Sequence, residues 1–490
     1  MASDHDRPGR MERLKTVPPG DTRREAIALA LIVALGVGAR LAFAARFPTL
    51  PFWDSLQLIH FASLLRLHGL TAPGWYWAQF NPGLPMILSA LFRLFPGDPT
   101  TVARTATGIA TGLLGAIPFL TWRSVVPFRG RLLAGVLLAL WPGQILFSGV
   151  VLQDNWVMLP VVALGCLAAR RLLGGASASP IAVGLLYAAG VAIRQEMLIV
   201  LLPLVLAAAV GGLEARRRLT LLAATVGLCL FALCAQRHAA TQRFSLATEH
   251  GGLALFGSFM PGASGPGWID ARAYAATLAP EAPGKPFGDQ RTLLRLTWEE
   301  VRRRPFFHAL RIATWLPRVA VNADGDSLLW SVGYPRAQSP DRQPAAQALA
   351  SAVAPLLNAE LAVFHGLFVG SLLLGWKRRD RAILVLSLSI LLKFLVHAVV
   401  SPLGRLVMPA IALELLVIPL GLALFAQETP RRRIAALSAG CATAAFLLLA
   451  VPRLAAIVIR NDPPDNTSGA REDPDRSSTE SRAPLANSSA

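Results

Sequence analysis

Residues 146–165 read LFSGVVLQDNWVMLPVVALG and place one carboxylate, Asp154, between two apolar runs that are each long enough to enter a membrane. An ionised side chain at membrane depth is costly unless it is buried in protein or faces water. A carboxylate just before an apolar run is also a common helix N-cap. The stretch therefore predicts a membrane protein in which Asp154 either caps a helix or belongs to a polar site.

The composition supports the membrane assignment. Of 490 residues, 54% are hydrophobic, and the mean hydropathy of +0.50 is too high for a soluble chain of this length. A bilayer core of about 30 Å needs about 20 apolar residues of helix, so we expect an all-α polytopic membrane protein with about eleven transmembrane helices. The expected spans are 26–45, 100–122, 132–150, 154–169, 180–194, 197–213, 219–236, 351–375, 382–400, 406–426 and 434–457. Residues 192–199 are either a true turn or a break in one bent hairpin.

The basic residues fall in short clusters between the apolar runs. The formal net charge is +18, but no DNA- or RNA-binding motif accompanies these clusters, so we expect no nucleic-acid partner. Lys and Arg concentrate in alternate connecting segments, which the positive-inside rule places in the cytoplasm together with the N-terminus. The first span exceeds the apolar region of a signal peptide and contains Arg40, so we expect a retained helix. The four cysteines all lie in apolar runs and indicate neither a disulfide framework nor a CxxC metal site.

This orientation divides the chain into five parts. They are a basic cytoplasmic N-terminus (1–25), a transmembrane module (26–236) with an outer loop (46–99), an outer region (237–350), C-terminal transmembrane helices (351–457) and a disordered tail (458–490). Aromatic clusters and apolar residues at helical period predict interfacial helices in both outer segments. The tail is polar and contains no aromatic residue, which is typical of disorder.

Ionisable side chains from separate regions reach the outer side in this orientation. They are Asp54, Asp154, Arg194, Glu196, His250, His397 and Arg405. Their convergence predicts one outward-facing polar site. Taken singly, each has a structural alternative: Asp54 and Asp154 are also placed to cap helices. Arg405 is placed to snorkel to lipid headgroups, and His397 to bond between helices.

Several short motifs carry a family resemblance. They are WDSLQLIHFASLL with Asp54 and Ala62, NPGLPMILSALFRLF with Pro82, the helix-opening Asp154, GVAIRQEMLI, ATEHGGLALFGSFMPG and HAVVSPLGRLVMPAI. In order and spacing, over approximately residues 26–425, the chain resembles the GT-C membrane glycosyltransferases. The similar branch contains the lipid A aminoarabinose transferase and the protein O-mannosyltransferases. The chain departs from the family at Ser55, where many members carry Glu, and its first outer loop has arginines but no lysine.

The resemblance implies a GT-C-like fold and transfer of a hexosyl or pentosyl group from a polyprenyl-phosphate donor. The acceptor would be extracytoplasmic: a glycolipid such as lipid A, a polysaccharide or a protein. The implied location is a bacterial inner membrane, with the active site on its outer face and the polyprenyl tail among the membrane lipids.

The resemblance also implies roles for the site residues. Asp54 would be the general base, and Arg194 and Arg405 would stabilise the leaving phosphate. Asp154 would orient a sugar, and Glu196, His250 and His397 would contact substrate. Metal use stays open, because Asp54, Asp154 and His250 offer oxygen and nitrogen ligands without a tight ligand spacing, so a divalent metal is possible and no cofactor is certain.

Two other functions remain as alternatives. A lipid or small-molecule transporter also buries ionisable residues, but usually near the membrane midplane and within internal repeats, which this sequence does not display. An O-antigen ligase or polymerase shares lipid-linked sugar substrates and a large outer loop, but the early Asp54 loop argues against it.

Overall fold

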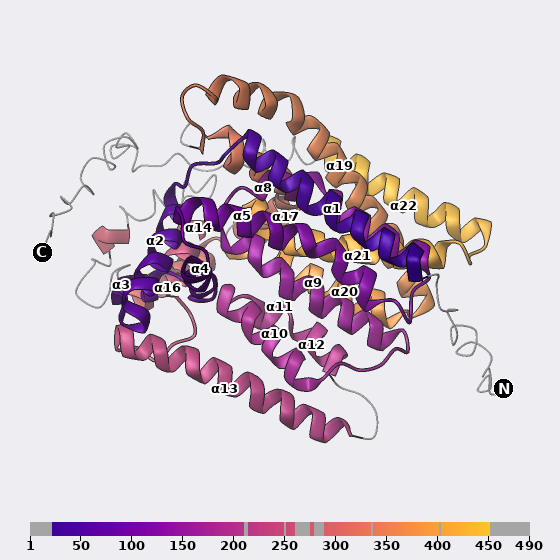
Figure 1. Ribbon diagram of the computed structural model, residues 1–490. Coiled ribbons are helices and arrows are strands. Elements are labelled where there is room, and N and C mark those ends of the chain that lie inside the picture. The colour runs from indigo at the N-terminus through magenta and orange to yellow at the C-terminus, as the bar shows by residue number, and fades with distance from the viewer. Residues whose placement is uncertain are drawn as a thin grey trace, which may run out of the picture.

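The computed structural model describes residues 22–209, 214–248, 251–259, 275–278, 289–334, 337–400 and 403–450. Every regular element in these ranges is a helix, and long helices run side by side in a bundle (Figure 1). The N-terminal residues 1–21 and the expected tail 458–490 lie outside the described residues.

Within the described ranges, seven helical segments are long and apolar enough to cross a membrane, so the protein is an all-α polytopic membrane protein. They are α1 (Thr22–Arg46), α9 (Gln153–Leu172), α13 (Ala215–Thr241), α19 (Gln343–Arg378), α20 (Arg381–Val400), η7 (Gly404–Val407) with α21 (Met408–Phe425), and α22 (Pro430–Leu449). Each coincides with an expected span.

The structure does not confirm the full count of eleven spans, because the other four expected spans consist of shorter helices. These are α5 (Pro99–Gly112), η4 (Leu113–Gly115) and α6 (Ala116–Thr121) in 100–122; α7 (Phe128–Leu140) and α8 (Pro142–Phe147) in 132–150; α10 (Pro180–Ile193) in 180–194; and α11 (Met197–Val200) and α12 (Leu202–Ala209) in 197–213.

The break between α7 and α8 has a clear physical cause. Pro142 has no N–H and cannot bond the carbonyl of Leu138, four residues earlier. The buried Arg40 of α1 instead donates to the carbonyls of Leu138 at 3.1 Å and Ala139 at 2.6 Å. A basic side chain in the first span therefore satisfies backbone acceptors that the proline leaves open.

Residues 192–199 form a true turn. α10 ends at Ile193, Arg194 is extended at φ −145°, and α11 begins at Met197. The Tyr187 hydroxyl donates to the carbonyl of Leu198 at 2.6 Å, which ties the two sides of this turn together.

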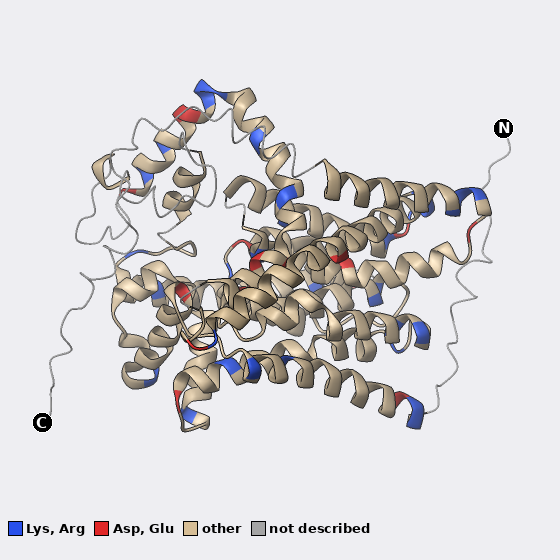
Figure 2. Cartoon of the chain, turned by 90° about the horizontal axis from the view of Figure 1, so that it is seen from above, with Lys and Arg blue, Asp and Glu red and all other residues tan. Residues whose placement is uncertain are grey.

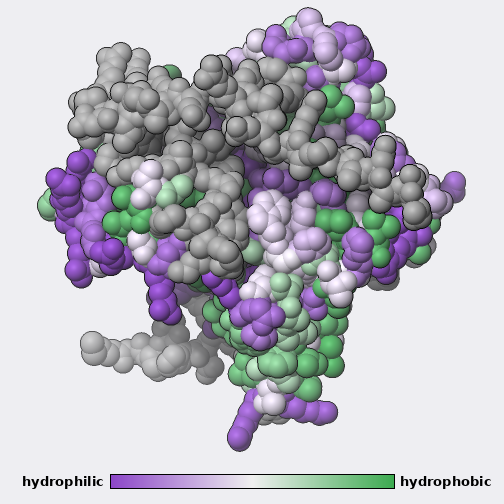
Figure 3. Space-filling view, turned by 90° about the vertical axis from the view of Figure 1, so that its left-hand side faces the viewer, coloured by the Kyte–Doolittle hydropathy of each residue, from purple (hydrophilic) through white to green (hydrophobic). Residues whose placement is uncertain are grey.

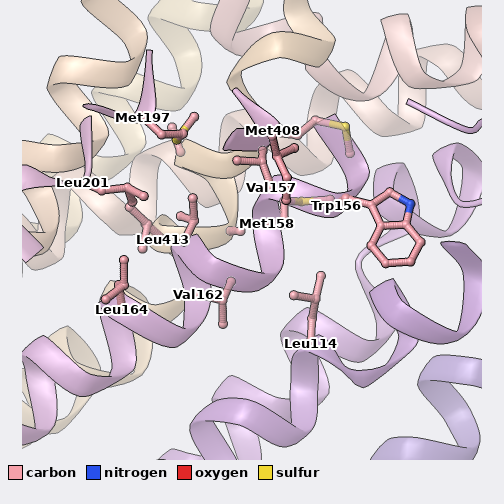
Figure 4. Packing of buried hydrophobic residues seen from close by; sticks show 14 of the residues in the cluster. Leu114, Trp156, Val157, Met158, Val162, Leu164, Met197, Leu201, Met408 and Leu413 are labelled. Carbon is pink, nitrogen blue, oxygen red and sulfur yellow. The ribbon is translucent and has the colours of Figure 1, made fainter. Parts of the chain in front are cut away.

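α9 and α21 occupy the centre of the bundle, whereas α13 and α22 lie at its periphery (Figure 1). In the core, Val157 and Met158 of α9 lie close to Met408 and Leu413 (Figure 4). Burial of these apolar side chains holds the N-terminal ends of α9 and α21 in place. Asp154 lies at the first of these ends and Arg405 just before the second.

The remaining helices lie in the two segments that were expected to carry interfacial helices. Segment 46–99 contains α2 (Trp53–His68), η3 (Gly69–Thr71), α3 (Gly74–Gln79) and α4 (Gly83–Leu94). Segment 237–350 contains α14 (Gly251–Phe259), α16 (Gln290–Arg303), α17 (Pro305–Val321), α18 (Ala323–Leu328) and the π-helix η5 (Leu329–Gly333).

Helices α2, α3, α4, α14 and α16 gather at one end of the bundle, on the left in Figure 1, which we call the α2 end. Figure 3 faces this end and shows hydrophilic side chains over much of its visible surface. Many Lys and Arg residues lie at the opposite end, where α1 and α22 begin (Figure 2). The cytoplasmic position of that opposite end stays a prediction from the basic residues.

Candidate functional site

Asp154 lies in the first turn of α9, but it is not the helix cap. The N-cap position belongs to Leu152, whose side chain makes no capping bond. The buried Asp154 carboxylate instead pairs with Arg194, with 2.7 Å between Oδ1 and Nη2. The structure therefore favours an ion pair across the bundle over the capping alternative for this carboxylate.

Glu196 joins the α10–α11 turn to α20. Its Oε1 atom accepts from Arg194 Nη1 at 3.2 Å and from Lys393 Nζ at 2.9 Å. Lys393 also donates to Nε2 of His397 at 2.8 Å. A neutral His397 ring then carries its proton on Nδ1. Lys393 of α20 thus completes a network of alternating charges, and His397 of the same helix is hydrogen-bonded to it.

Lys393 is completely buried and was missed in the sequence analysis. Two signals point to it. The residue is the one charged side chain within the apolar stretch LSLSILLKFLVHAVV (386–400), and it precedes His397 by four residues, so both lie on one helix face. An ionisable residue inside an apolar span is itself a reason to look for a partner.

The site has two halves. The first is the network of Asp154, Arg194, Glu196, Lys393 and His397, and the second is formed by the contacts of Arg405. Its Nη2 atom lies 4.0 Å from Oδ2 of Asp54, and its backbone N–H donates to Asp326 at 3.3 Å. Its guanidinium carbon lies 3.6 Å from the ring centre of Trp330. Because Arg405 is buried, the snorkelling alternative does not describe it. Burial raises the pKa of the Asp326 carboxyl, and Arg405 opposes that rise.

Asp54 lies in the first turn of α2, where Phe52 holds the N-cap position without a capping side chain. Its side chain is 35% exposed, in contrast to the buried Asp154. A carboxylate near a helix N-terminus is stabilised by the helix dipole. Asp54 therefore combines a fixed position with access to other molecules.

The two halves of the site act on each other electrostatically. Arg405 is attracted by Asp154 as well as by Asp54, and Arg194 by Asp54 as well as by its direct partners. The structure thus brings together six of the expected site residues: Asp54, Asp154, Arg194, Glu196, His397 and Arg405. The seventh, His250, lies outside the described residues.

Several buried donor atoms of this cluster have no hydrogen-bond partner within the described chain. They are Nε and Nη1 of Arg405, Nε of Arg194 and Nδ1 of His397. Leaving a buried donor unpaired costs about 1–3 kcal/mol, and more for a charged group. Such donors are suited to a ligand that offers acceptor oxygens, and arginine matches phosphate best.

The first outer loop contains arginines but no lysine. Arg93 of α4 donates to the carbonyls of Leu65 and Arg66 in α2, so it fastens these two helices together. Among the described residues, no group of three or more His, Cys, Asp or Glu side chains is arranged to hold a metal. The proposed set of Asp54, Asp154 and His250 is not tested by this, because His250 is not described.

Four aromatic rings border Asp54 and Arg405. They belong to Phe52, Trp53, Trp330 and Tyr334, and every pair of these rings lies with centres between 5.0 and 5.8 Å apart. These four residues were not predicted to belong to the site. Their contact depends on packing α2 against η5, about 275 residues later in the chain.

Comparison of the chain with models of known protein families gave no match, and comparison with characterised proteins gave none either.

Proposed function

We propose that the protein is a membrane glycosyltransferase that moves a sugar from a polyprenyl phosphate to an acceptor hydroxyl. The family resemblance in the sequence suggests this reaction, and one observation supports it above the others. A partly exposed carboxylate, Asp54, lies 4.0 Å from a buried arginine, Arg405, that has two donor atoms without partners among the described residues. The pair offers a proton acceptor and a phosphate ligand side by side.

In the proposed reaction, the acceptor oxygen attacks the anomeric carbon of the donor sugar. The acceptor O–H proton passes to the Asp54 carboxylate as the new C–O bond forms. The bond between the anomeric carbon and the phosphate oxygen breaks, and its electron pair leaves on the phosphate. Arg405 stabilises the negative charge that develops there.

Arg405 is held ready for this role. The Trp330 ring supports one face of its guanidinium, and Asp326 fixes its backbone. This arrangement leaves Nε and Nη1 for phosphate oxygens. Arg194, in contrast, already binds Asp154 and Glu196, so we assign the leaving phosphate to Arg405 and a supporting charge to Arg194.

Lys393, Glu196 and His397 would act by positioning. The Lys393–Glu196 pair fixes the turn that carries Arg194, and Arg194 in turn holds Asp154. Because these charges alternate in sign, the network keeps several ionised groups together in a buried place. Asp154, held by Arg194 in the first turn of α9, would orient a sugar hydroxyl.

A lipid-linked donor agrees with the position of these groups along the helices. Asp154 and Arg405 lie in the first turns of membrane-spanning segments, and His397 lies in the last turn of α20. A polyprenyl tail would stay in hydrocarbon while its phosphate reaches the helix ends. Transporter sites usually lie nearer the midplane, in broken helices, so this placement favours transfer over transport.

The test is mass spectrometry of polyprenyl-phosphate sugars in cells that lack the protein. The null cells are complemented at matched expression with the native protein, with Asp54→Asn or with Asp341→Asn, whose carboxylate is 76% exposed. We expect one lipid-linked sugar to accumulate in the null and Asp54→Asn cells and to disappear with the native protein and Asp341→Asn. An unchanged lipid pool with intact surface glycans would contradict the proposal and favour a transporter.

A further inference from the structure

Trp53 has an unusual backbone conformation. Its φ is +44°, one of three positive values among the described non-glycine residues. For a bulky residue this region is strained, at a cost of order 1–3 kcal/mol, and such strain persists only where the surrounding structure enforces it. Trp53 begins α2 and directly precedes Asp54, the proposed general base, so its backbone conformation helps to set the position of that carboxylate.

The Trp53 side chain is held in place but not covered. Its ring meets Phe52, Trp330 and Tyr334 edge to face, with ring centres 5.1, 5.6 and 5.2 Å away. Phe52 and Trp330 are buried, yet Trp53 remains 40% exposed. Three neighbours thus fix the indole, and part of it stays open beside Asp54.

The fixed rings also link Trp53 to the proposed phosphate ligand. Trp330 contacts the Trp53 ring and also lies under the Arg405 guanidinium. An exposed indole, a carboxylate and an arginine with free donor atoms therefore adjoin one another. If the phosphate of a bound molecule contacts Arg405 and its reacting carbon faces Asp54, the ring that contains this carbon lies close to Trp53.

We propose that Trp53 is a stacking platform for the ring of the transferred sugar and so helps to select a glycosylated donor over bare polyprenyl phosphate. This inference rests on the proposed function. One face of a pyranose or furanose is made of C–H groups, and an indole face offers it apolar contact without competing hydrogen bonds. A pre-positioned ring would hold the anomeric carbon toward Asp54 at little entropic cost.

A simpler role for Trp53 is that of a membrane-interface anchor, as is common for tryptophan. An anchor would affect the bare and the glycosylated lipid equally, because both share the tail and the phosphate. A sugar platform would affect only the glycosylated lipid. The ratio of the two affinities therefore separates the two roles.

The test measures binding of undecaprenyl phosphate, bare or carrying glucose, galactose, mannose or arabinose, to the full-length protein in nanodiscs. The variants are Trp53→Leu, Trp53→Phe and, as a matched control, Trp75→Leu, because Trp75 is 38% exposed on α3. Retention of the native elution volume and thermal transition shows that each variant folds.

We expect the preference of the native protein for its best glycosylated lipid to fall about five- to tenfold in Trp53→Leu, with binding of the bare lipid unchanged. Trp53→Phe should keep most of that preference, and Trp75→Leu all of it. An equal loss for both lipids, or an unchanged preference, would overturn the platform alone. If the native protein prefers no glycosylated lipid over the bare one, the proposed function fails and the platform fails with it.

Discussion

Replacing Arg405 with lysine keeps a positive charge but removes the planar guanidinium. Arg405 has two buried donors, Nε and Nη1, that bond no atom of the described chain and could bind a phosphate, and its guanidinium carbon lies 3.6 Å from the Trp330 ring centre. The N–H donors of lysine all lie on one nitrogen atom, so lysine cannot form the same pair of parallel hydrogen bonds to a phosphate. We therefore expect Arg405→Lys to fold and to bind its donor, but to stabilise the leaving phosphate poorly.

The size of the effect follows from the contacts. Loss of one of two hydrogen bonds to a charged phosphate removes about 1.5–3 kcal/mol. Since about 1.4 kcal/mol corresponds to a factor of ten, kcat/KM should fall by roughly ten- to 150-fold. Most of the loss should be in kcat, because the charge on the phosphate oxygen grows as the bond breaks.

The assay is the initial rate of transfer from a radiolabelled polyprenyl-phosphate sugar in proteoliposomes. Arg93→Lys is the matched control, because in the described part of the chain the Arg93 guanidinium bonds carbonyls of α2 and no residue of the site, and this variant should retain near-native turnover. If Arg405→Lys works within twofold of the native rate, the assignment of the leaving phosphate to Arg405 is wrong.

Two further predictions concern stability. Lys393→Met should destabilise the protein by about 3 kcal/mol, because Glu196 loses a buried partner, and adding Glu196→Gln should recover much of that loss; thermal unfolding in detergent measures both. Burial lowers the pKa of His308, in α17, to about 4, so the folded state binds fewer protons than the unfolded state below pH 6.5. Stability should therefore be full above about pH 6.5 and fall toward pH 4, and His308→Phe should weaken that pH dependence; an equal dependence in both proteins would refute it.

The sequence predicted the class of fold because span length and apolar content are local properties. All seven long apolar segments coincide with expected spans. The count of eleven spans is not confirmed where breaks interrupt the apolar runs, as at Pro142; the motif LWPGQ (140–144) contains the proline that causes one of these breaks. A proline inside an apolar run interrupts a helix even where the average hydropathy of the run is high.

The sequence also predicted that most residues of the polar cluster lie on one side of the membrane, but it did not predict which of them contact each other. Asp154 and Asp54 are each compatible with a helix cap, and only the packing of α9 against the α10–α11 turn shows that Asp154 pairs with Arg194. Lys393 was counted as part of an apolar span. Asp326 and Trp330 reach Arg405 through contacts across about 80 residues of chain, which no local pattern encodes.

The most direct test of the central claim uses purified, reconstituted protein with the lipid-linked sugar that accumulates in null cells. The released polyprenyl phosphate is measured together with donor binding, for the native protein, Asp54→Asn and Asp341→Asn. The account predicts that Asp54→Asn binds the donor with native affinity but releases polyprenyl phosphate at least 100-fold more slowly, consistent with loss of about 3 kcal/mol of general-base catalysis, while Asp341→Asn stays native. Normal release by a folded Asp54→Asn protein would contradict it.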